Sequence, residues 1–342
     1  MSRPHLRRRN KLIVWKSDGF EDRWDTSMST NVQKQELTAG AGPTIAILGM
    51  AYWLETAAEM VRRVGMRHMI VKAHSYGELV KWALSGQWRQ CDLIYHVWGD
   101  YWPVGLIGKL VRRPVLWHWF GSDILTFKKR KGWSGVLQEK SVKRWASGHV
   151  ADSPELAQEL KAMGIEAPVV RLLPKFIEAD IEPLPATFTV LSYWRDDRRD
   201  FYGGNILLKL ADEFPQFKFL VANASGKGEP PRPNVEFLGF QTDMPALYRR
   251  CSALFRLPEH DSLSAMVLEM MARGRYIIYN KPMTGCHFAI DLDQARAALV
   301  DIARSTGPNL AGSEFVRETF SIDKEKQVLE TCCRKILLGA TE

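Results

Sequence analysis

The stretch Arg256-Leu-Pro-Glu-His-Asp-Ser-Leu-Ser-Ala-Met-Val-Leu-Glu-Met-Met-Ala-Arg-Gly274 decides the fold of this sequence. Its pattern predicts the end of a short strand, a loop, and a helix from Ser264 to Arg273 that is closed by a glycine. A turn of this kind presents free backbone N–H groups and the positive end of a helix dipole. The segment therefore predicts an anion-binding site at the end of a strand.

Three side chains within this segment carry the chemical argument. Asp261 and Ser264 are residue types that cap helices. Glu269 falls about one and a half turns into the helix, which is too deep for a cap. Its neighbours are apolar, so a buried carboxylate at this position needs a polar partner. A pair of sugar or ribose hydroxyls would provide one.

On both sides of this stretch, short apolar runs alternate with segments of helical spacing. The expected strands are 44–48, 68–73, 91–98, 114–119, 148–151, 169–173, 188–192, 217–222, 235–238, 253–257 and 276–279. The expected helices include 51–64, 76–85, 101–111, 205–214, 244–251, 264–273 and 323–338. Apolar strands that alternate with helices predict parallel sheets covered on both faces, which is an α/β fold.

A proline-rich break at 174–185 divides the pattern into two similar halves. We therefore predict an irregular basic extension (1–42), two Rossmann-like domains (43–178 and 187–320), and a C-terminal helix (321–342). A single doubly wound domain with insertions is the alternative.

The quoted stretch resembles the donor-binding signature of retaining glycosyltransferases of the GT-B fold, family-4 type. That signature has two acidic residues separated by seven others, followed by a small-residue tail that ends in glycine. Asp261 and Glu269 occupy the two acidic positions, although the family usually has Glu and then Gly where this sequence has Asp261 and Ser262. The resemblance implies two domains that face each other across a cleft, with the C-terminal helix crossing back to the first domain.

The same resemblance extends to two other segments of the second half. Residues 233–248 are similar to the family's base-binding strand and loop, which implies that Gly239 and Phe240 meet the nucleotide base. The turn 193–204 lies where family members hold a basic residue on the diphosphate. Arg198 is the first choice for this role and Arg195 the second, since an arginine can donate two parallel hydrogen bonds to a phosphate.

In the first half, Leu116-Trp-His-Trp-Phe-Gly-Ser-Asp123 follows a strand, where the family often has a histidine that faces the sugar. This makes His118 a catalytic or positioning candidate beside Asp261, with a satisfied core histidine as the alternative. Gly49 ends the first strand, where the family's turn approaches the donor phosphate.

The resemblance implies transfer of a sugar from a nucleoside diphosphate sugar to an acceptor hydroxyl, with retention and without a metal or other cofactor. A UDP-sugar is the expected donor. The expected donor-binding residues are Gly49, Arg195, Arg198, Gly239, Phe240, His260, Ser262, Leu263, Ser264 and Glu269. By this resemblance Glu269 binds the ribose, while Asp261 and the loop amides face the sugar and the diphosphate.

Positive charge is concentrated in one window of the sequence. The formal net charge of the chain is +8, and residues 101–150 alone account for an excess of that size. The expected anionic-surface residues are Lys128, Lys129, Arg130, Lys131, Lys140, Lys143 and Arg144. Basic residues near Trp133 and Trp145 suit a lipid-linked acceptor at an anionic membrane, or nucleic acid. A transferase acting on modified DNA bases, and a non-enzymatic nucleic-acid-binding protein on the same fold, therefore stay open.

Composition and short motifs limit the cellular location and the classes of protein that fit this sequence. The five cysteines have no metal-like spacing, which favours free thiols in a reducing compartment. No run of apolar residues is long enough for a membrane span, and the basic N-terminus is not followed by the apolar stretch of a secretory signal. We therefore expect a cytoplasmic protein, with peripheral membrane attachment as an option. No G-x-G-x-x-G follows a strand, which disfavours a dinucleotide-dependent oxidoreductase.

Overall fold

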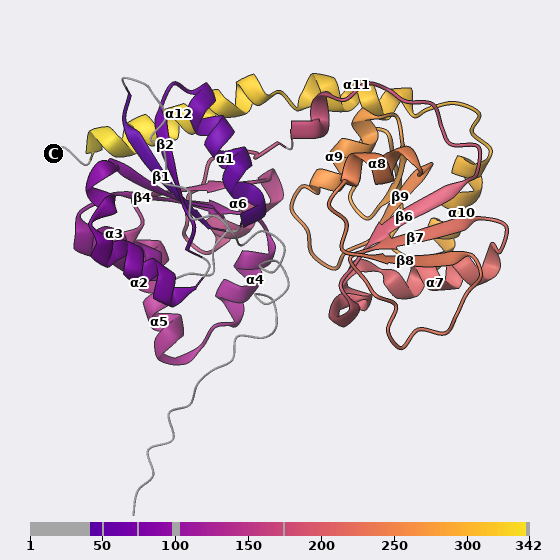
Figure 1. Cartoon of the computed structure of the whole chain (residues 1–342), viewed down its shortest axis with the longest axis horizontal. Helices are drawn as coiled ribbons and strands as arrows, with labels where there is room; N and C mark the ends of the chain where they lie inside the picture. The colour runs from indigo at the N-terminus through magenta and orange to yellow at the C-terminus, as the bar shows by residue number, and fades with distance from the viewer. Residues whose placement is uncertain (1–41, 50, 74, 98–102, 174, 340–342) are drawn as a thin grey trace, which may run out of the picture. The chain divides into compact units, whose positions relative to one another are not determined.

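A computed structural model describes residues 42–49, 51–73, 75–97, 103–173 and 175–339. These residues belong to one unit of the chain, Leu37–Glu342, and form two parallel sheets (Figure 1). Apart from Gly42, the predicted N-terminal extension lies outside the described residues.

The first sheet has five parallel strands in the order β2-β1-β3-β4-β5. The strands are β1 (Thr44–Gly49), β2 (Arg67–Val71), β3 (Leu93–Val97), β4 (Val115–Trp119) and β5 (Gly148–Ala151). The helices of this half are α1 (Ala51–Arg63), α2 (Tyr76–Ser85), α3 (Pro103–Val111), α4 (Ser122–Lys129), α5 (Gly132–Lys140) and α6 (Pro154–Ala162). Alternate residues of β1 enter two different cores: Ile45 and Ile47 pack into one, Ala46 and Leu48 into the other. The sheet is therefore buried on both faces, as its apolar strands predict.

The second sheet has six parallel strands in the order β11-β10-β9-β6-β7-β8. The strands are β6 (Thr189–Tyr193), β7 (Lys218–Ala222), β8 (Val235–Gly239), β9 (Ala253–Arg256), β10 (Tyr276–Tyr279) and β11 (Cys286–Phe288). Its helices are α7 (Gly204–Glu213), α8 (Met244–Arg249), α9 (Ala265–Ala272), α10 (Leu292–Ala303) and α11 (Leu310–Thr319). Two separate apolar cores again cover its faces. This order is that of a Rossmann sheet, and the first sheet has the flavodoxin-like order.

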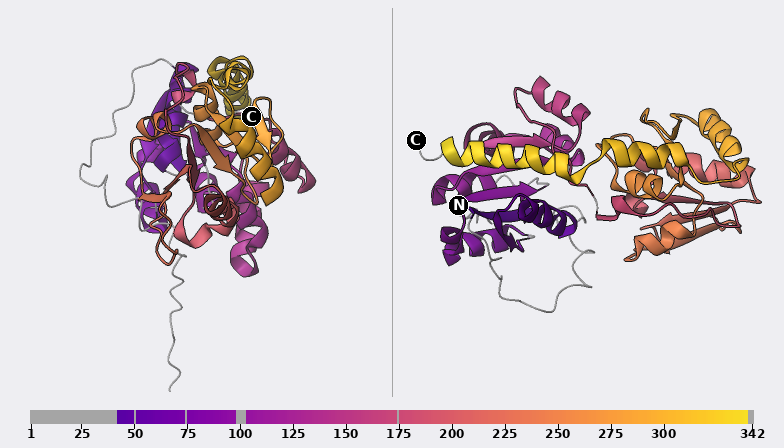
Figure 2. Two further views of the ribbon diagram at one scale, coloured as in Figure 1. Left: turned by 90° about the vertical axis from the view of Figure 1, so that its right-hand side faces the viewer. Right: turned by 90° about the horizontal axis from the view of Figure 1, so that it is seen from above.

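The last helix, α12 (Ile322–Gly339), packs against the first sheet's helix α1 rather than against the second sheet alone. Leu329 and Cys333 are fully buried in the core that contains α1. Glu325 accepts hydrogen bonds from the backbone N–H and the guanidinium of Arg171, at 2.8 and 2.9 Å. Figure 2 shows α12 in yellow along the elements of the first sheet.

Most predicted strands and helices are confirmed to within one or two residues at each end. The strand predicted at 169–173 is wrong: only Val169 pairs, in an isolated bridge with Ala151. Instead, the backbone N–H of Leu172 donates to the Asp152 carboxylate, and the backbone N–H of Arg171 donates to the Glu325 carboxylate. The predicted linker contains one 3₁₀ turn, Lys175–Glu178. The domain boundaries at 43–178 and 187–320 stay a prediction.

Candidate functional site

In the second sheet, the order in which the chain adds strands reverses between the adjacent strands β6 and β9. From β6 the chain continues to β7 and β8 on one side, and from β9 to β10 and β11 on the other. At such a switch point the loops that follow the two strands diverge, and ligands of open α/β sheets bind there. The turn that begins at Arg195 follows β6, and the loop that begins at Leu257 follows β9. The two segments singled out in the sequence therefore meet at one edge of the sheet.

Two cationic side chains, Arg256 and Lys281, hold the loop after β9 in place. Arg256 forms an ion pair with Asp261, with nitrogen-to-oxygen distances of 2.9 and 2.8 Å. Lys281 donates to the carbonyls of Asp261 and Ser262, at 2.6 and 2.7 Å. The carboxylate of Asp261 and the carbonyls of Asp261 and Ser262 are therefore already occupied as acceptors. A ligand that needs hydrogen-bond donors would have to use backbone N–H groups of this segment.

The N-terminus of α9 offers such donors. Ser264 is the N-cap residue, but neither its side chain nor that of Asp261 caps the helix, which corrects the capping predicted for both. Among the described residues, the N–H groups of Ala265 and Met266 have no hydrogen-bond acceptor. Unpaired N–H groups at the positive end of a helix dipole suit an anion.

Glu269 is buried in α9, as its apolar neighbours predict. Its partner within the chain is the Tyr248 hydroxyl, which donates to the carboxylate at 2.6 Å. Burial raises the pKa of Glu269 to about 7, an effect that the hydrogen bond from Tyr248 and the charge of Arg273 oppose. The carboxyl is therefore poised between its neutral and charged forms near neutral pH.

The two arginines after β6 differ in their contacts. Arg195 forms a two-pronged ion pair with Asp197, with both distances at 3.0 Å. Arg198 is exposed, lies over the ring of Phe201, and has no acidic partner among the described residues. Arg198 is thus the cation of this pair that is available to a ligand.

Gly239 ends the edge strand β8, which β7 separates from β6, and Phe240 follows it. Gly239 has a φ of +62°, and its carbonyl accepts from the Asn223 backbone at 2.6 Å. The Phe240 side chain is about half exposed. An aromatic ring at the carboxyl edge of a sheet is the type of group on which a base can stack.

Polar contacts connect the loop after β9 to the first sheet. Ser262 donates to Asp152, which directly follows β5, at 3.1 Å. Burial raises the pKa of Asp152 well above its ordinary value. His260 contacts Glu159 at 2.9 Å, and Glu159 also pairs with Lys128 at 2.7 Å. Two separate sets of polar contacts, Ser262 with Asp152 and His260 with Glu159 and Lys128, thus join the loop to the first half of the chain.

His118 is a core residue in this structure. Its ring is fully buried between Tyr95 and Phe120, and its Nδ1 lies 2.6 Å from the Tyr95 hydroxyl. Burial lowers the pKa of His118 to about 3, so the ring is neutral.

Gly49 has a steric reason to be glycine. Its φ is +143°, and a Cβ at this position would lie 1.7 Å from the carbonyl oxygen of Val97. The close approach of β1 and β3 therefore requires glycine, whatever the ligand.

The structure separates the basic residues that the sequence groups into one surface. Lys128 is at the carboxyl edge with Glu159, and Lys143 pairs with Glu139 at 3.1 Å. Lys140 and Arg144 instead line a hollow beside the amino ends of β4 and β5, with other cations. Lys129, Arg130 and Lys131 lie at the end of α4 and the turn before α5. The predicted anionic-surface residues therefore lie in more than one place, and their binding of an anion stays a prediction.

Four residues of the site had no assigned role in the sequence: Arg256, Lys281, Tyr248 and Asp152. Asp152 directly follows a predicted strand and Lys281 lies two residues after another, so the rule that ligands bind at the carboxyl ends of strands could have identified them. Tyr248 had no such signal, because its pairing with Glu269 joins two helices.

Among residues 42–339 that the structure describes, no group of three His, Cys, Asp or Glu side chains could hold a metal ion. Within the same part of the chain, none of the helices is both long and apolar enough to cross a membrane.

A comparison with protein-family models found none that matches this sequence, and a comparison with curated proteins also found no match. Solved structures do match. HepE of Anabaena in complex with UDP-glucose has a TM-score of 0.63 and 14% identity, over 86% of this chain and 100% of that one. Sucrose-phosphate synthase of Thermosynechococcus elongatus has a TM-score of 0.67 and 14% identity, over 87% and 100%.

A glycosyltransferase from Rickettsia africae has a TM-score of 0.63 and 13% identity, over 86% of this chain and 99% of that one. At such low identity the likeness concerns the fold, and it extends over both sheets. The chain therefore has the GT-B fold of these glycosyltransferases, which confirms the fold that the segment Arg256 to Gly274 predicted.

Proposed function

We propose that this protein is a glycosyltransferase that moves a sugar from a nucleoside diphosphate sugar to an acceptor hydroxyl. The observation that carries the proposal is the convergence at the β6–β9 switch point. An exposed arginine, two unpaired helix N–H groups and a buried carboxyl lie there at one sheet edge. These are the groups that a phosphate and a ribose require.

The diphosphate would bind between Arg198 and the N-terminus of α9. Arg198 has no acidic partner among the described residues, so its charge is available. The backbone N–H groups of Ala265 and Met266 would add two uncharged hydrogen-bond donors, whose positions the helix fixes. In the transfer step, these groups would stabilise the charge that develops on the leaving diphosphate, in place of a metal ion.

The ribose would bind Glu269, and the base would lie against Gly239 and Phe240. Glu269 is held in place by Tyr248, which fixes one carboxylate oxygen. A ribose hydroxyl donating to this carboxyl would favour its charged form, so donor binding should lower the pKa of Glu269. HepE is similar in fold and binds UDP-glucose, which supports a UDP-sugar as the donor.

Asp261 would act on the sugar through the loop that Arg256 and Lys281 hold, rather than as a free carboxylate. The acceptor hydroxyl would enter from the carboxyl edge of the first sheet, where Asp152 and Glu159 meet the loop. We propose retention of the anomeric configuration on the resemblance alone. The two nucleic-acid alternatives gain no support from the comparisons, and we do not propose them.

A thermal-shift screen against sugar nucleotides tests this proposal, followed by calorimetry with the nucleotide that gives the largest shift. We expect Glu269→Ala to abolish donor binding. Because this substitution also removes a buried hydrogen bond, the exposed Arg198→Ala provides a second test. Loss of a charged hydrogen bond should weaken binding by about tenfold or more.

The control is Lys209→Ala, an exposed cation on α7 whose removal should leave donor affinity unchanged. Near-normal donor affinity in both Glu269→Ala and Arg198→Ala would refute this site.

A further inference from the structure

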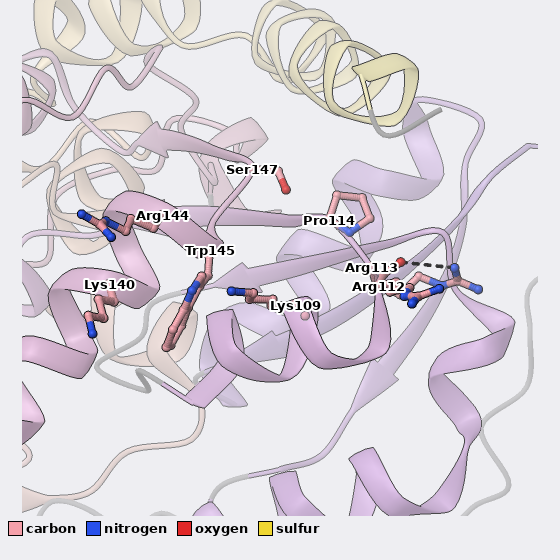
Figure 3. Close-up of a pocket in the computed structure, with 9 residues that line it drawn as sticks. Lys109, Arg112, Arg113, Pro114, Lys140, Arg144, Trp145 and Ser147 are labelled. Carbon is pink, nitrogen blue, oxygen red and sulfur yellow. Dashed lines mark hydrogen bonds between the residues drawn. The ribbon is translucent and has the colours of Figure 1, made fainter. Parts of the chain in front are cut away.

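A second charged site lies on the first sheet, at the edge opposite the candidate donor site. A hollow of about 560 Å³ opens beside Pro114 and Ser147, the residues that precede β4 and β5 (Figure 3). The loop after β9, which carries part of the proposed donor site, instead meets Asp152, the residue that follows β5. From Pro114 to Phe120 the strand advances about 20 Å. The hollow is therefore separate from the transfer site.

The lining of this hollow is strongly basic. It includes Lys109, Arg112, Arg113, Lys140, Arg144 and Trp145, and no acidic residue. None of these five cations has an ion pair with an acid among the described residues, unlike Lys128 and Lys143. Lys109 points toward the Trp145 ring, with its Nζ 5.7 Å from the ring centroid (Figure 3). Five like charges without counter-ions favour an anionic partner.

Two of these arginines carry further marks of an incomplete site. The buried Nε of Arg113 has no hydrogen-bond partner among the described residues. Arg112 has a φ of +54°, a conformation in which glycine is the favoured residue. Arg112 thus has an unfavourable backbone conformation at the end of α3, and its side chain lines the hollow.

Exposed apolar side chains surround this charge on the same helices. The large exposed apolar residues described in the first half all lie on α2, α3 and α5: Val80, Leu84, Leu110, Trp133 and Val136. Leu84 is 83% exposed and Leu110 is 72% exposed. Helix α2 packs on α3, and α3 and α5 both pack on the turn Ser141–Trp145.

We propose that α2, α3, α5 and this hollow form a surface that docks on an anionic lipid bilayer. Phosphate headgroups would occupy the basic hollow, while Leu84, Leu110 and Val136 enter the boundary of the acyl region and Trp133 stays at the interface. A bilayer satisfies both the charges and the apolar side chains. Nucleic acid would satisfy only the charges and leave the aliphatic side chains in water. This docking does not depend on the proposed transferase activity.

Vesicle flotation tests the proposal with the full chain. We expect binding to vesicles of phosphatidylcholine mixed with phosphatidylglycerol, no binding to phosphatidylcholine alone, and a decrease with added salt. The variant Lys109→Gln/Lys140→Gln/Arg144→Gln should bind about 100-fold more weakly, at roughly fivefold per cation. The matched control Lys209→Gln/Arg249→Gln/Arg250→Gln removes the same charge from the second sheet's helices and should bind like the parent.

Two further variants distinguish lipid docking from nucleic-acid binding and from a purely structural role of Arg112. Leu84→Ser/Leu110→Ser should weaken vesicle binding but leave binding to duplex DNA unchanged. Arg112→Gly relieves the left-handed backbone, so its melting temperature should not fall, whereas its vesicle binding should fall about fivefold. A merely structural arginine would show no change in binding.

Several results would overturn the proposal. These are no binding to anionic vesicles, tighter binding to duplex DNA than to vesicles at equal phosphate concentration, or vesicle binding unaffected by Leu84→Ser/Leu110→Ser. Stabilisation by UDP-glucose should be the same in the charge variant and the parent. A failure of donor binding would therefore be seen separately from a failure of docking.

Discussion

At the scale of single residues, the candidate donor site is a set of charges that the protein itself has mostly paired. Asp261 is neutralised by Arg256, and Arg195 by Asp197. Arg198 differs because it is exposed and has no acidic partner among the described residues. Glu269 differs because its carboxyl is buried and accepts from the Tyr248 hydroxyl. These two residues therefore carry most of the expected response to a ligand.

We expect Glu269→Gln to change how stability depends on pH. Burial raises the pKa of Glu269 from 4.5 to about 7 in the folded protein. Between these values the folded chain binds more protons than the unfolded chain, so the parent's free energy of unfolding falls as pH rises. At about 1.4 kcal/mol per pKa unit, the fall approaches roughly 3 kcal/mol. Glutamine can still accept from Tyr248 but does not titrate, so this part of the dependence should disappear.

Urea unfolding of both proteins at pH values on either side of this interval measures the effect. Other buried carboxyls, such as Asp123 and Asp152, also have raised pKa values, but they are present in both proteins and cancel in the difference. Parallel pH profiles of the parent and the variant would contradict the assignment.

At the scale of elements, α12 is distinctive because its contacts lie far from its neighbours in sequence. It follows the helices of the second sheet, yet its buried face enters the core of the first sheet beside α1. Glu325 adds a charged contact to Arg171, which is 154 residues away in the sequence. The helix therefore stabilises the first sheet although it is made last.

Two adjacent substitutions on α12 test this role. Leu329 is fully buried, so Leu329→Ala should lower the free energy of unfolding by about 3 kcal/mol, as for other large-to-small core changes. Val328 is exposed, so Val328→Ala should change it by less than about 1 kcal/mol. Chemical denaturation of the two variants provides the comparison. Equal effects at both positions would mean that α12 does not dock through this face.

At the scale of the whole molecule, the two edges of each sheet have different chemistry. The carboxyl edge of the second sheet gathers the loop after β9, the N-terminus of α9 and the turn after β6. The amino edge of the first sheet carries the basic hollow. Because the ends of parallel strands all face the same way, segments from distant parts of the sequence lie together at each edge.

Hydrogen exchange should report the difference between the two edges of the second sheet. On addition of UDP-glucose, we expect slower exchange in 257–268 and 239–241, because bound phosphate and base would cover the N–H groups there. Residues 215–218 and 233–236 lie at the opposite edge of the second sheet and should be unaffected. Mass spectrometry of peptides from these segments measures the difference. Protection at the amino edge, or none at the carboxyl edge, would count against the donor site.

The sequence by itself determined the element order, both parallel sheets and the position of the loop after β9. These follow from local rules: apolar strands buried on both faces, and a strand, loop and helix whose spacing is contained in one short segment, Arg256 to Gly274. Only the tertiary structure decided which charges are paired. Arg256 and Asp261 are only five residues apart in the sequence. Glu269 and Tyr248, however, are 21 residues apart, and Ser262 and Asp152 are 110 residues apart.

The same distinction explains two features that the sequence left open. His118 lies near the carboxyl end of β4, which fits either a site residue or a core residue, and its packing between Tyr95 and Phe120 buries it. The basic window looked like one surface because its residues are close in sequence, but α4 and α5 carry its members to opposite edges of the sheet. Burial and ion pairing depend on contacts between distant elements, which no local pattern contains.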